Sequence, residues 1–479
     1  MSFDEDAKIV ISKLEHYASQ SRSRKKPALK QRPIKEIHEK LGLMAHYRDG
    51  DLSGAALDAF LDGYLDNTTR LHHPGYLAHQ VGVPHPTGAL GSLIDGFTNN
   101  AMAIYEMGPA AAAIEFFLVN LLLSKIGWQP MPEEAEQRLT FDHGGGVLTH
   151  GGSLANLTAM LVARNHLDGS IRASGAPSDL AILAPEASHY SVGKAAGIIG
   201  IGEKNLVALE TDDCGRVCVS RLEQAYGKAR AAGRRIVALV ANACSTGTGL
   251  YDPIDEIAEF CREKGIWFHV DGAHGASALF SRKNRRHLDG LHKADSVILD
   301  AHKMLRTPNV CACLLVRDAR TLDRVFEHKA SYLFHEKKQP GFDFIQQTIE
   351  CTKAGLGLKF YLSLAAMGEK GIETYLDRQQ ELTLEAYEYI ASQPGFEVAC
   401  RPESTILCFR LNGPDKVQLF VRDRLIEDGR FYISSTELKG RRFLRIVIMG
   451  PQISMEDIRE LVDRIRSLAP QEAPPDIDL

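Results

Sequence analysis

The chain has 479 residues, of which 44% are hydrophobic and 24% are charged, and its formal net charge is −5 at pH 7. This length and composition are typical of a globular protein with two or three domains and a large buried core. The negative net charge argues against a protein that binds nucleic acid or anionic membranes through its overall charge.

Residues 1–90 are predicted to form an N-terminal helical segment. Its basic run Arg22–Arg32 has no interleaved aromatic side chains, so a solvated arm explains it better than a nucleic-acid site. The first residues, MSFDEDAKIV, lack the basic start and apolar core of a secretion signal, and the nine cysteines include no CxxC pair. We therefore expect free thiols and a cytoplasmic protein.

An apolar stretch, Ala110–Leu123, follows this segment. Glu115 and Asn120 interrupt it, and it is shorter than the roughly 20 residues that a membrane span needs. The stretch predicts a buried helix, and no membrane is expected as a partner.

Residues 91–375 are predicted to form a large α/β domain, because short apolar runs alternate with longer helical periods such as Leu154–Arg164 and Ile254–Phe260. We place Pro253 at the first position of the second helix. This alternation favours a mostly parallel, buried sheet. The predicted strands are Gly146–Thr149, Leu180–Leu183, Ile236–Val240, Ile266–Val270 and Ser296–Leu299.

Residues 376–479 are predicted to form a smaller C-terminal α+β domain. Its strands are expected at Ser404–Leu411 and Phe443–Met449. A last helix, with an apolar stripe, is expected to begin at Ser454 as its N-cap.

Polar residues follow several predicted strands, which is where open α/β sheets bind ligands. The turn Thr149–Ser153 contains two glycines and opens a helix, so its free backbone N–H groups suit a phosphate. By itself this turn is more often an ordinary strand-to-helix connection. Its spacing matches neither GxxxxGK[ST] nor GxGxxG.

Three side chains at other strand ends have two interpretations each. Asp271 precedes small residues and suits a protonated pyridine nitrogen, although by itself a helix N-cap is more common. His189 suits stacking on a flat ring, or a purely structural role. Lys303 stands among apolar residues, where an imine-forming lysine gains a depressed pKa; a lysine that reaches out to solvent is an equal alternative.

As a set, these motifs resemble the group II pyridoxal-phosphate decarboxylases, which include glutamate, aromatic-amino-acid, cysteine-sulfinate and 2,4-diaminobutyrate decarboxylases. The resemblance extends from about His73 to Leu468. It implies a fold of the aspartate aminotransferase type (fold type I), pyridoxal 5′-phosphate as cofactor, and a homodimer with a shared active site. The segments that carry it are HPGYLAH, YEMGPAAAAIE, GGSLANLTAML, FHVDGAHG, AHKML, ASYLFHEK and FLRIVI.

The resemblance also implies roles for single residues. Lys303 would carry the cofactor as a Schiff base, Asp271 would pair with the pyridine nitrogen, and Ala273 and His189 would lie against the two faces of the ring. Tyr332 would protonate the α-carbon from a mobile loop.

The remaining matched positions concern the phosphate, the cofactor hydroxyl and the substrate. Gly152, Ser153 and His302 match phosphate-binding positions, and Thr246 matches a residue near the hydroxyl. Arg445 matches an arginine that binds the substrate carboxylate. His79 stands where glutamate decarboxylases carry a glutamine, which implies contact with the substrate.

Several residues depart from the family pattern. Asp300-Ala301 replaces Asn-Pro, which puts a carboxylate near the expected phosphate, and His150 replaces a serine or small residue. Ala101 and Ala103 stand where glutamate decarboxylases carry Asn and Phe. The predicted substrate is therefore an acidic or short polar L-amino acid: glutamate, aspartate, cysteine sulfinate or 2,4-diaminobutyrate.

Other functions remain as alternatives. An aromatic-amino-acid decarboxylase, a decarboxylating aldehyde synthase and a non-catalytic cofactor-binding protein share the same scaffold. Tyr332 and His189 are both present, which favours simple decarboxylation over aldehyde formation.

A metal site is also disfavoured. Adjacent histidines cannot easily share one ion, and no carboxylate stands at ligand spacing, so no metal is expected. The histidines concerned are His72, His73, His79 and His85.

Overall fold

The computed structural model describes residues 2–134, 137–138, 141–326 and 341–470. The chain forms two compact units. One comprises Met1–Val83, Glu381–Arg401 and Thr405–Leu479, and the other comprises Pro84–Gln380 and Pro402–Ser404. The N-terminal and C-terminal segments, which the sequence treats as separate parts, thus share the first unit.

A seven-stranded sheet organises the second unit. Its strands are β1 (Gly145–Thr149), β2 (Leu180–Pro185), β3 (Leu206–Leu209), β4 (Arg235–Asn242), β5 (Trp267–Asp271), β6 (Ser296–Asp300) and β7 (Ala312–Val316). The order is β1-β7-β6-β5-β4-β2-β3. Strands β2 to β6 run parallel, whereas β7 is antiparallel to both of its neighbours. The predicted α/β class and mostly parallel sheet are therefore confirmed.

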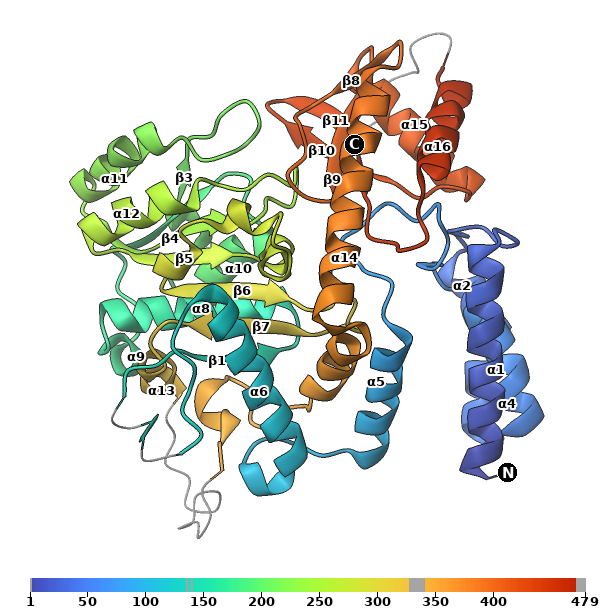
Figure 1. Cartoon of the computed structure of the whole chain (residues 1–479), viewed down its shortest axis with the longest axis horizontal. Helices are drawn as coiled ribbons and strands as arrows, with labels where there is room; N and C mark the ends of the chain where they lie inside the picture. The colour runs from blue at the N-terminus through green and yellow to red at the C-terminus, as the bar shows by residue number, and fades with distance from the viewer. Residues whose placement is uncertain (1, 135–136, 139–140, 327–340, 471–479) are drawn as a thin grey trace. The chain divides into compact units, whose positions relative to one another are not determined.

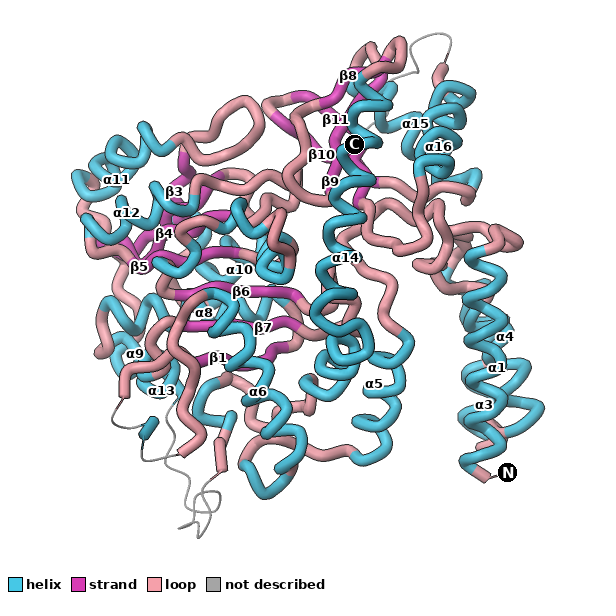
Figure 2. Tube along the Cα trace, viewed as in Figure 1, coloured by secondary structure: helices cyan, strands magenta, loops and turns pink. Residues whose placement is uncertain are grey.

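Helices lie on both faces of this sheet (Figures 1 and 2). The α-helices are α5 (Pro86–Thr98), α6 (Pro109–Ile126), α8 (Gly152–Leu167), α9 (Ile171–Ser174), α10 (Tyr190–Ile198), α11 (Leu222–Ala231), α12 (Ile254–Lys264), α13 (Arg320–Phe326) and α14 (Gly357–Ala391). Short 3-10 turns are η1 (Tyr105–Met107), η2 (Glu203–Asn205), η3 (Val219–Arg221), η4 (Gly275–Phe280), η5 (Arg285–Leu288), η6 (Leu291–Lys293) and η7 (Phe344–Gln347).

All five predicted strands of this unit are present, with ends that shift by one or two residues. The prediction missed β3 and β7. Pro253 is the N-cap of α12 rather than its first helical residue.

Helix α6 contains the apolar stretch of the sequence. By length and composition it could cross a membrane, and 39% of it is buried. Its Glu115 is fully buried, binds Lys353 Nζ at 2.6 Å, and accepts a hydrogen bond from Leu148 N of β1 at 2.8 Å. A buried ion pair and a bond to the sheet mark α6 as a core helix.

The first unit combines N-terminal helices with a small C-terminal sheet. The helices are α1 (Phe3–Arg22), α2 (Ile34–Leu41), α3 (Leu43–Asp49), α4 (Gly54–Leu65), α15 (Asp415–Asp428) and α16 (Met455–Leu468). The strands are β8 (Phe396–Val398), β9 (Ile406–Leu411), β10 (Ser434–Leu438) and β11 (Arg441–Val447), all antiparallel in the order β10-β11-β9-β8. Ser454 caps α16 in a capping box with Asp457, as predicted for that residue.

The core of this unit lies between the sheet and its helices. Leu425 of α15 and Leu461 of α16 pack with Phe409 of β9 and Ile446 of β11. Leu77 of the N-terminal segment belongs to the same core. The N-terminal segment is thus part of a core formed by residues far along the chain.

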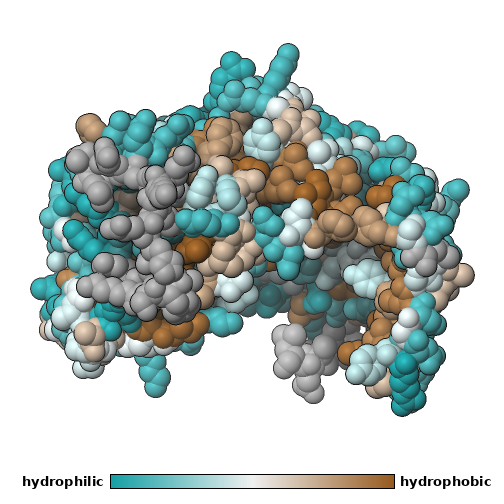
Figure 3. Space-filling model, turned by 90° about the horizontal axis from the view of Figure 1, so that it is seen from below, coloured by the Kyte–Doolittle hydropathy of each residue, from teal (hydrophilic) through white to brown (hydrophobic). Residues whose placement is uncertain are grey.

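The surface of the molecule carries exposed hydrophobic side chains. Figure 3 shows one face of the molecule, where hydrophobic side chains lie among hydrophilic ones. Helix α5 exposes Leu90, Leu93, Ile94 and Phe97.

Seven cysteines are free, whereas Cys214 and Cys400 are disulfide-bonded, so the expectation of free thiols is wrong for those two.

Candidate active site

The carboxyl ends of the strands bring most of the predicted site residues of the second unit to one edge of the sheet. Asp271 ends β5 and Asp300 ends β6. His189 is the N-cap of α10, which follows β2. Both Thr149 and Asp300 pair with Ala312, so β1 ends at the same edge. A strand-end site is where open α/β folds bind ligands.

Lys303 lies in the turn after β6, and its side chain is 15% exposed. Its Nζ is 3.1 Å from Asp300 Oδ2. His302 Nε2 is 3.7 Å from the same oxygen, and His302 Nδ1 contacts Cys311 O at 2.8 Å. A primary amine and a carboxylate therefore meet in a nearly closed site.

The Asp271 carboxylate is held on both oxygens by N–H donors. Asn156 Nδ2 donates to Oδ2 at 2.9 Å, and Ala273 N donates to Oδ1 at 3.1 Å. Asp271 is 6% exposed. Donors to both oxygens fix the direction of the carboxylate.

A buried hydrogen-bond chain leads from β5 to this carboxylate. Trp267 Nε1 donates to Ser296 Oγ at 2.8 Å, and Ser296 Oγ is 2.8 Å from His269 Nδ1. His269 Nε2 lies 2.9 Å from Asn156 Oδ1. Because the amide N–H₂ of Asn156 faces Asp271, its oxygen must accept, so His269 carries its proton on Nε2.

The same chain reaches His189. Asn156 Nδ2 donates to Ser191 Oγ at 2.9 Å, and Ser191 Oγ is 2.7 Å from His189 Nδ1. Burial lowers the pKa of His189, and the Asp271 charge opposes this effect. His189 is thus held as the neutral ring with its proton on Nε2.

Sequence reasoning gave no role to His269, Asn156 or Ser191. One signal was present in the sequence: His269 and Asp271 are two residues apart on a strand, so their side chains share a face. Asn156 is a buried amide in a helix whose buried residues are mostly apolar. Its position signals a hydrogen-bonding role, but its partners are visible only in the fold.

The turn before α8 forms an open cradle of backbone. Gly151 has φ 94°, and nothing lies within 4 Å of a Cβ placed there. A Cβ on Gly152 would come within 2.7 Å of Asp300 Oδ1, so a larger residue would displace the carboxylate. Ser153 is exposed, and α8 has no side-chain cap on its first N–H groups. This helix start suits an anion.

Two residues that depart from the family pattern flank this cradle. His150 Nδ1 binds Glu350 Oε1 at 2.5 Å. Asp300 is 4% exposed, and its Oδ1 has no hydrogen-bond partner. Thr246 lies partly buried in the turn after β4.

The predicted substrate residues Arg445 and His79 belong to the first unit. Arg445 Nη1 donates to Ala78 O at 3.2 Å and to Ser434 Oγ at 3.3 Å. His79 Nε2 is 2.8 Å from Tyr432 Oη. Burial lowers the pKa of His79, and the Arg445 charge acts in the same direction. Tyr332 lies outside the described residues.

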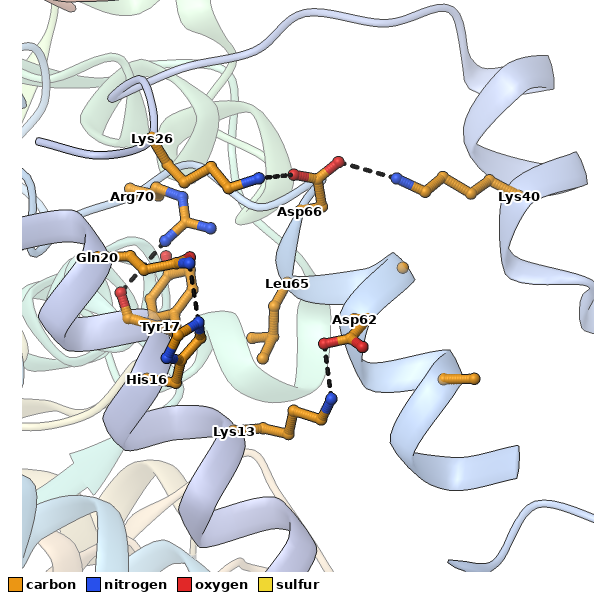
Figure 4. A pocket seen from close by; sticks show the side chains of 12 residues that line it. Lys13, His16, Tyr17, Gln20, Lys26, Lys40, Asp62, Leu65, Asp66 and Arg70 are labelled. Atoms are coloured by element: carbon orange, nitrogen blue, oxygen red, sulfur yellow. Dashed lines mark hydrogen bonds and ion pairs between the residues drawn. The ribbon is translucent and has the colours of Figure 1, made fainter. Parts of the chain in front are cut away.

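A separate cavity of about 410 Å³ lies among the N-terminal helices (Figure 4). Lys13 binds Asp62 at 2.8 Å, and Lys26 and Lys40 reach Asp66 from two sides. Although burial raises the pKa of Asp66, these ammonium groups hold it well below its usual range. Because the charges of this cavity pair with one another, we place the candidate site at the sheet edge.

The residues that the structure describes contain no group of three or more His, Cys, Asp or Glu that could hold an ion. The site offers instead an amine, a fixed carboxylate and a neutral imidazole.

Comparisons with known proteins agree with this chemistry. Residues 71–412 match the family model described as the pyridoxal-dependent decarboxylase conserved domain. The acidic amino acid decarboxylase of Mus musculus is 32% identical over 77% of this chain and 69% of its own length. The cysteine sulfinic acid decarboxylase of Mus musculus is 30% identical over 83% of this chain and 82% of its own.

A third relative and a solved structure complete the comparison. The aromatic-L-amino-acid decarboxylase of Bacillus atrophaeus is 27% identical over 85% of this chain and 83% of its own. The crystal structure of mouse CSAD superposes with a TM-score of 0.85 and 26% identity, covering 97% of this chain and 98% of that chain.

Proposed function

The chain belongs to the pyridoxal-dependent decarboxylase family, and from that premise we propose that it removes carbon dioxide from an L-amino acid with an acidic or short polar side chain. Pyridoxal-phosphate-dependent decarboxylation of an amino acid is the activity of the family. The side-chain class rests on relatives named for acidic and cysteine sulfinic acids. The aromatic alternative is supported by a less similar relative.

The residues present fit pyridoxal phosphate. The open start of α8, with its uncapped N–H groups and empty space beside Gly151, suits the phosphate. Asp271, fixed by two donors, suits a protonated ring nitrogen, and Lys303 supplies the amine for covalent attachment. The three groups that the cofactor requires thus stand at one sheet edge.

The cofactor supplies the electron sink that accepts the bonding electrons of the departing carboxylate. Each residue has its own part in that step. Asp271, fixed by its two N–H donors, would accept the ring N–H and keep the proton on the ring nitrogen. His189, neutral and oriented by Ser191, would lie against the ring face and keep water from it. Lys303 would hold the cofactor between turnovers.

Substrate orientation is assigned to the first unit. Arg445 is a buried guanidinium and suits the substrate carboxylate that must stand across the plane of the ring. His79, neutral and paired with Tyr432, offers a polar contact to a short side chain.

Tyr332 is proposed as the acid that returns a proton to the α-carbon. Its presence favours amine over aldehyde as product. A homodimer with a shared active site is proposed as well, supported by the apolar side chains that α5 exposes.

Carbon dioxide release from the common L-amino acids tests the substrate class. We expect glutamate, aspartate, cysteine sulfinate or 2,4-diaminobutyrate to exceed L-DOPA and tryptophan in kcat/KM by at least about tenfold. A preference for an aromatic substrate would overturn the proposed side-chain class.

Borohydride trapping tests the cofactor site. The yellow holoprotein should be fixed by borohydride on Lys303, and Lys303→Ala should lose the covalent link and turnover. Lys194→Ala, which removes an exposed lysine of α10, should retain both. A colourless wild type that gains neither colour nor activity with added pyridoxal phosphate would end the proposal.

A further inference from the structure

The Asp300 carboxylate lies beside the helix start to which the proposed function gives a phosphate. It stands over the first residue of α8, because a Cβ on Gly152 would be 2.7 Å from Oδ1 and 2.9 Å from Oδ2. Gly152 and the open Gly151 turn form the anion-binding start of this 16-residue helix. The protein therefore places a carboxylate of its own beside its proposed anion site.

Only one of the two carboxylate oxygens is satisfied. Oδ2 faces Lys303 Nζ at 3.1 Å and His302 Nε2 at 3.7 Å. Oδ1 has no hydrogen-bond partner although Asp300 is 4% exposed. A buried oxygen without a partner is costly, which indicates that the cradle is complete only when another group is present.

The other titratable groups around Asp300 do not cancel its charge at Oδ1. Lys303 and His302 follow it in the same turn and face Oδ2. His189 of α10 interacts with it electrostatically, and burial keeps that ring neutral by lowering its pKa. Cys311, which precedes β7, interacts with it as well, and burial raises the pKa of its thiol to about 12.

We propose that the Asp300 carboxylate opposes phosphate binding at the start of α8, and that binding of the cofactor phosphate is coupled to uptake of one proton by this carboxylate. This inference rests on the proposed function. A phosphate dianion and a carboxylate at contact distance disfavour each other's charge, and a proton from solvent on Asp300 removes the conflict. The protonated carboxyl then donates a hydrogen bond to the phosphate. No bond to carbon forms or breaks in this step, and no electron is transferred.

The consequence is that the affinity for phosphate rises as the pH falls. A site that takes up one proton on binding gains up to about tenfold in affinity for each unit by which the pH falls, within the range where the carboxylate is charged in the free protein and protonated in the complex. Replacement of Asp300 by a neutral residue removes this dependence and strengthens phosphate binding at high pH.

The test compares pyridoxal phosphate with pyridoxal, which reacts with the same lysine but has no phosphate. The dissociation constant of pyridoxal divided by that of pyridoxal phosphate isolates the contribution of the phosphate from any change at Lys303. At about pH 8 we expect this ratio to be at least about tenfold larger in Asp300→Ala and Asp300→Asn than in the wild type. The difference should shrink towards pH 6, and the control Asp289→Asn, which removes an exposed carboxylate, should match the wild type.

Two variants are needed because asparagine adds an N–H donor while alanine only removes the charge. A larger ratio in Asp300→Asn alone would overturn the inference about Asp300. A ratio equal to that of the wild type in both variants would also overturn it. Sulfate, which does not titrate in this range, gives a second readout without the cofactor. It should raise the melting temperature of Asp300→Ala more than that of the wild type at about pH 8.

The sulfate measurement separates the two proposals. If the wild type gains no colour with pyridoxal phosphate, the proposed function fails, and the sulfate comparison alone decides the role of Asp300. Equal sulfate shifts in the wild type and in Asp300→Ala would overturn the inference even if the enzyme is fully active.

Discussion

At the residue scale, His269 is a titratable ring that the fold removes entirely from solvent. Burial lowers its pKa to about 4, whereas a free imidazole titrates near 6.5. The folded state therefore binds fewer protons than the unfolded chain. The stability that this histidine contributes is present above about pH 6.5 and is lost as the pH falls through about 4.

A variant without a titrating ring should reveal this effect. His269→Gln keeps one donor and one acceptor for Asn156 and Ser296. From about pH 7 to pH 4, we expect its free energy of unfolding to fall by roughly 3 kcal/mol less than that of the wild type. Denaturant unfolding at several pH values measures both slopes, and parallel slopes would contradict the assignment.

Tyr332 carries the second prediction at this scale. If its phenol returns the proton to the α-carbon, Tyr332→Phe should bind the cofactor normally and form amine about 100-fold more slowly. Part of the flux should appear as aldehyde, ammonia and peroxide. Tyr47→Phe, at an exposed position, is the control. Wild-type amine yield without peroxide in Tyr332→Phe would withdraw the role.

Sequence patterns located some site residues but not the groups that hold them. A predicted strand precedes each of Asp271, Lys303 and His189. Because the carboxyl ends of parallel strands lie at the same edge of a sheet, the sequence predicts that these side chains lie close together. Asn156 could not be paired with Asp271, because α8 and β5 are 115 positions apart at that contact. Such a bond depends on how one helix lies across the sheet.

At the element scale, one buried ion pair joins α6 to the segment before α14. Glu115 and Lys353 are both fully buried, and their charged atoms are 2.6 Å apart. Glu115→Gln leaves the Lys353 ammonium buried without a counter-charge, so we expect a loss of about 3–5 kcal/mol in the free energy of unfolding.

Two further variants test that prediction. Glu115→Gln combined with Lys353→Met removes both charges and should recover most of the loss. Glu369→Gln breaks the exposed pair between Lys125 of α6 and Glu369, and it should cost less than about 1 kcal/mol. Equal losses for the buried and the exposed pair, measured by denaturant unfolding, would contradict this account.

The two strands of the large sheet that the sequence did not reveal have separate physical reasons. Strand β7 follows β6 after an irregular connection, residues 301–311, and runs antiparallel, so it lacks the helix that normally separates parallel strands. Strand β3 is four residues long, lies at the edge of the sheet and is only partly buried. Neither produces the alternation of strand and helix on which the prediction depended.

At the scale of the whole molecule, the exposed apolar face of α5 supports a homodimer. Phe97 is 68% exposed, and Leu90, Leu93 and Ile94 lie on the same helix. Phe97→Asp should weaken self-association by at least about tenfold, because a charge in an apolar interface loses its hydration. The activity per chain of Phe97→Asp should fall when the protein is diluted and recover at higher protein concentration.

Sedimentation at several concentrations measures this equilibrium. A wild type that sediments as a fully active monomer would contradict both the dimer and the shared active site.

Two hydrogen bonds of the N-terminal segment can form only late in synthesis on the ribosome. Ala28 N donates to Gly429 O at 2.8 Å, and Leu77 N donates to Tyr432 O at 2.9 Å. The first of these pairs is 401 positions apart (429 − 28). At roughly 5–20 residues per second, the early helices emerge about 20–80 seconds before their partners exist. The hydrogen bonds that join the first 83 residues to the C-terminal part of the same unit can therefore form only after the long central segment, Pro84–Gln380, has been synthesised.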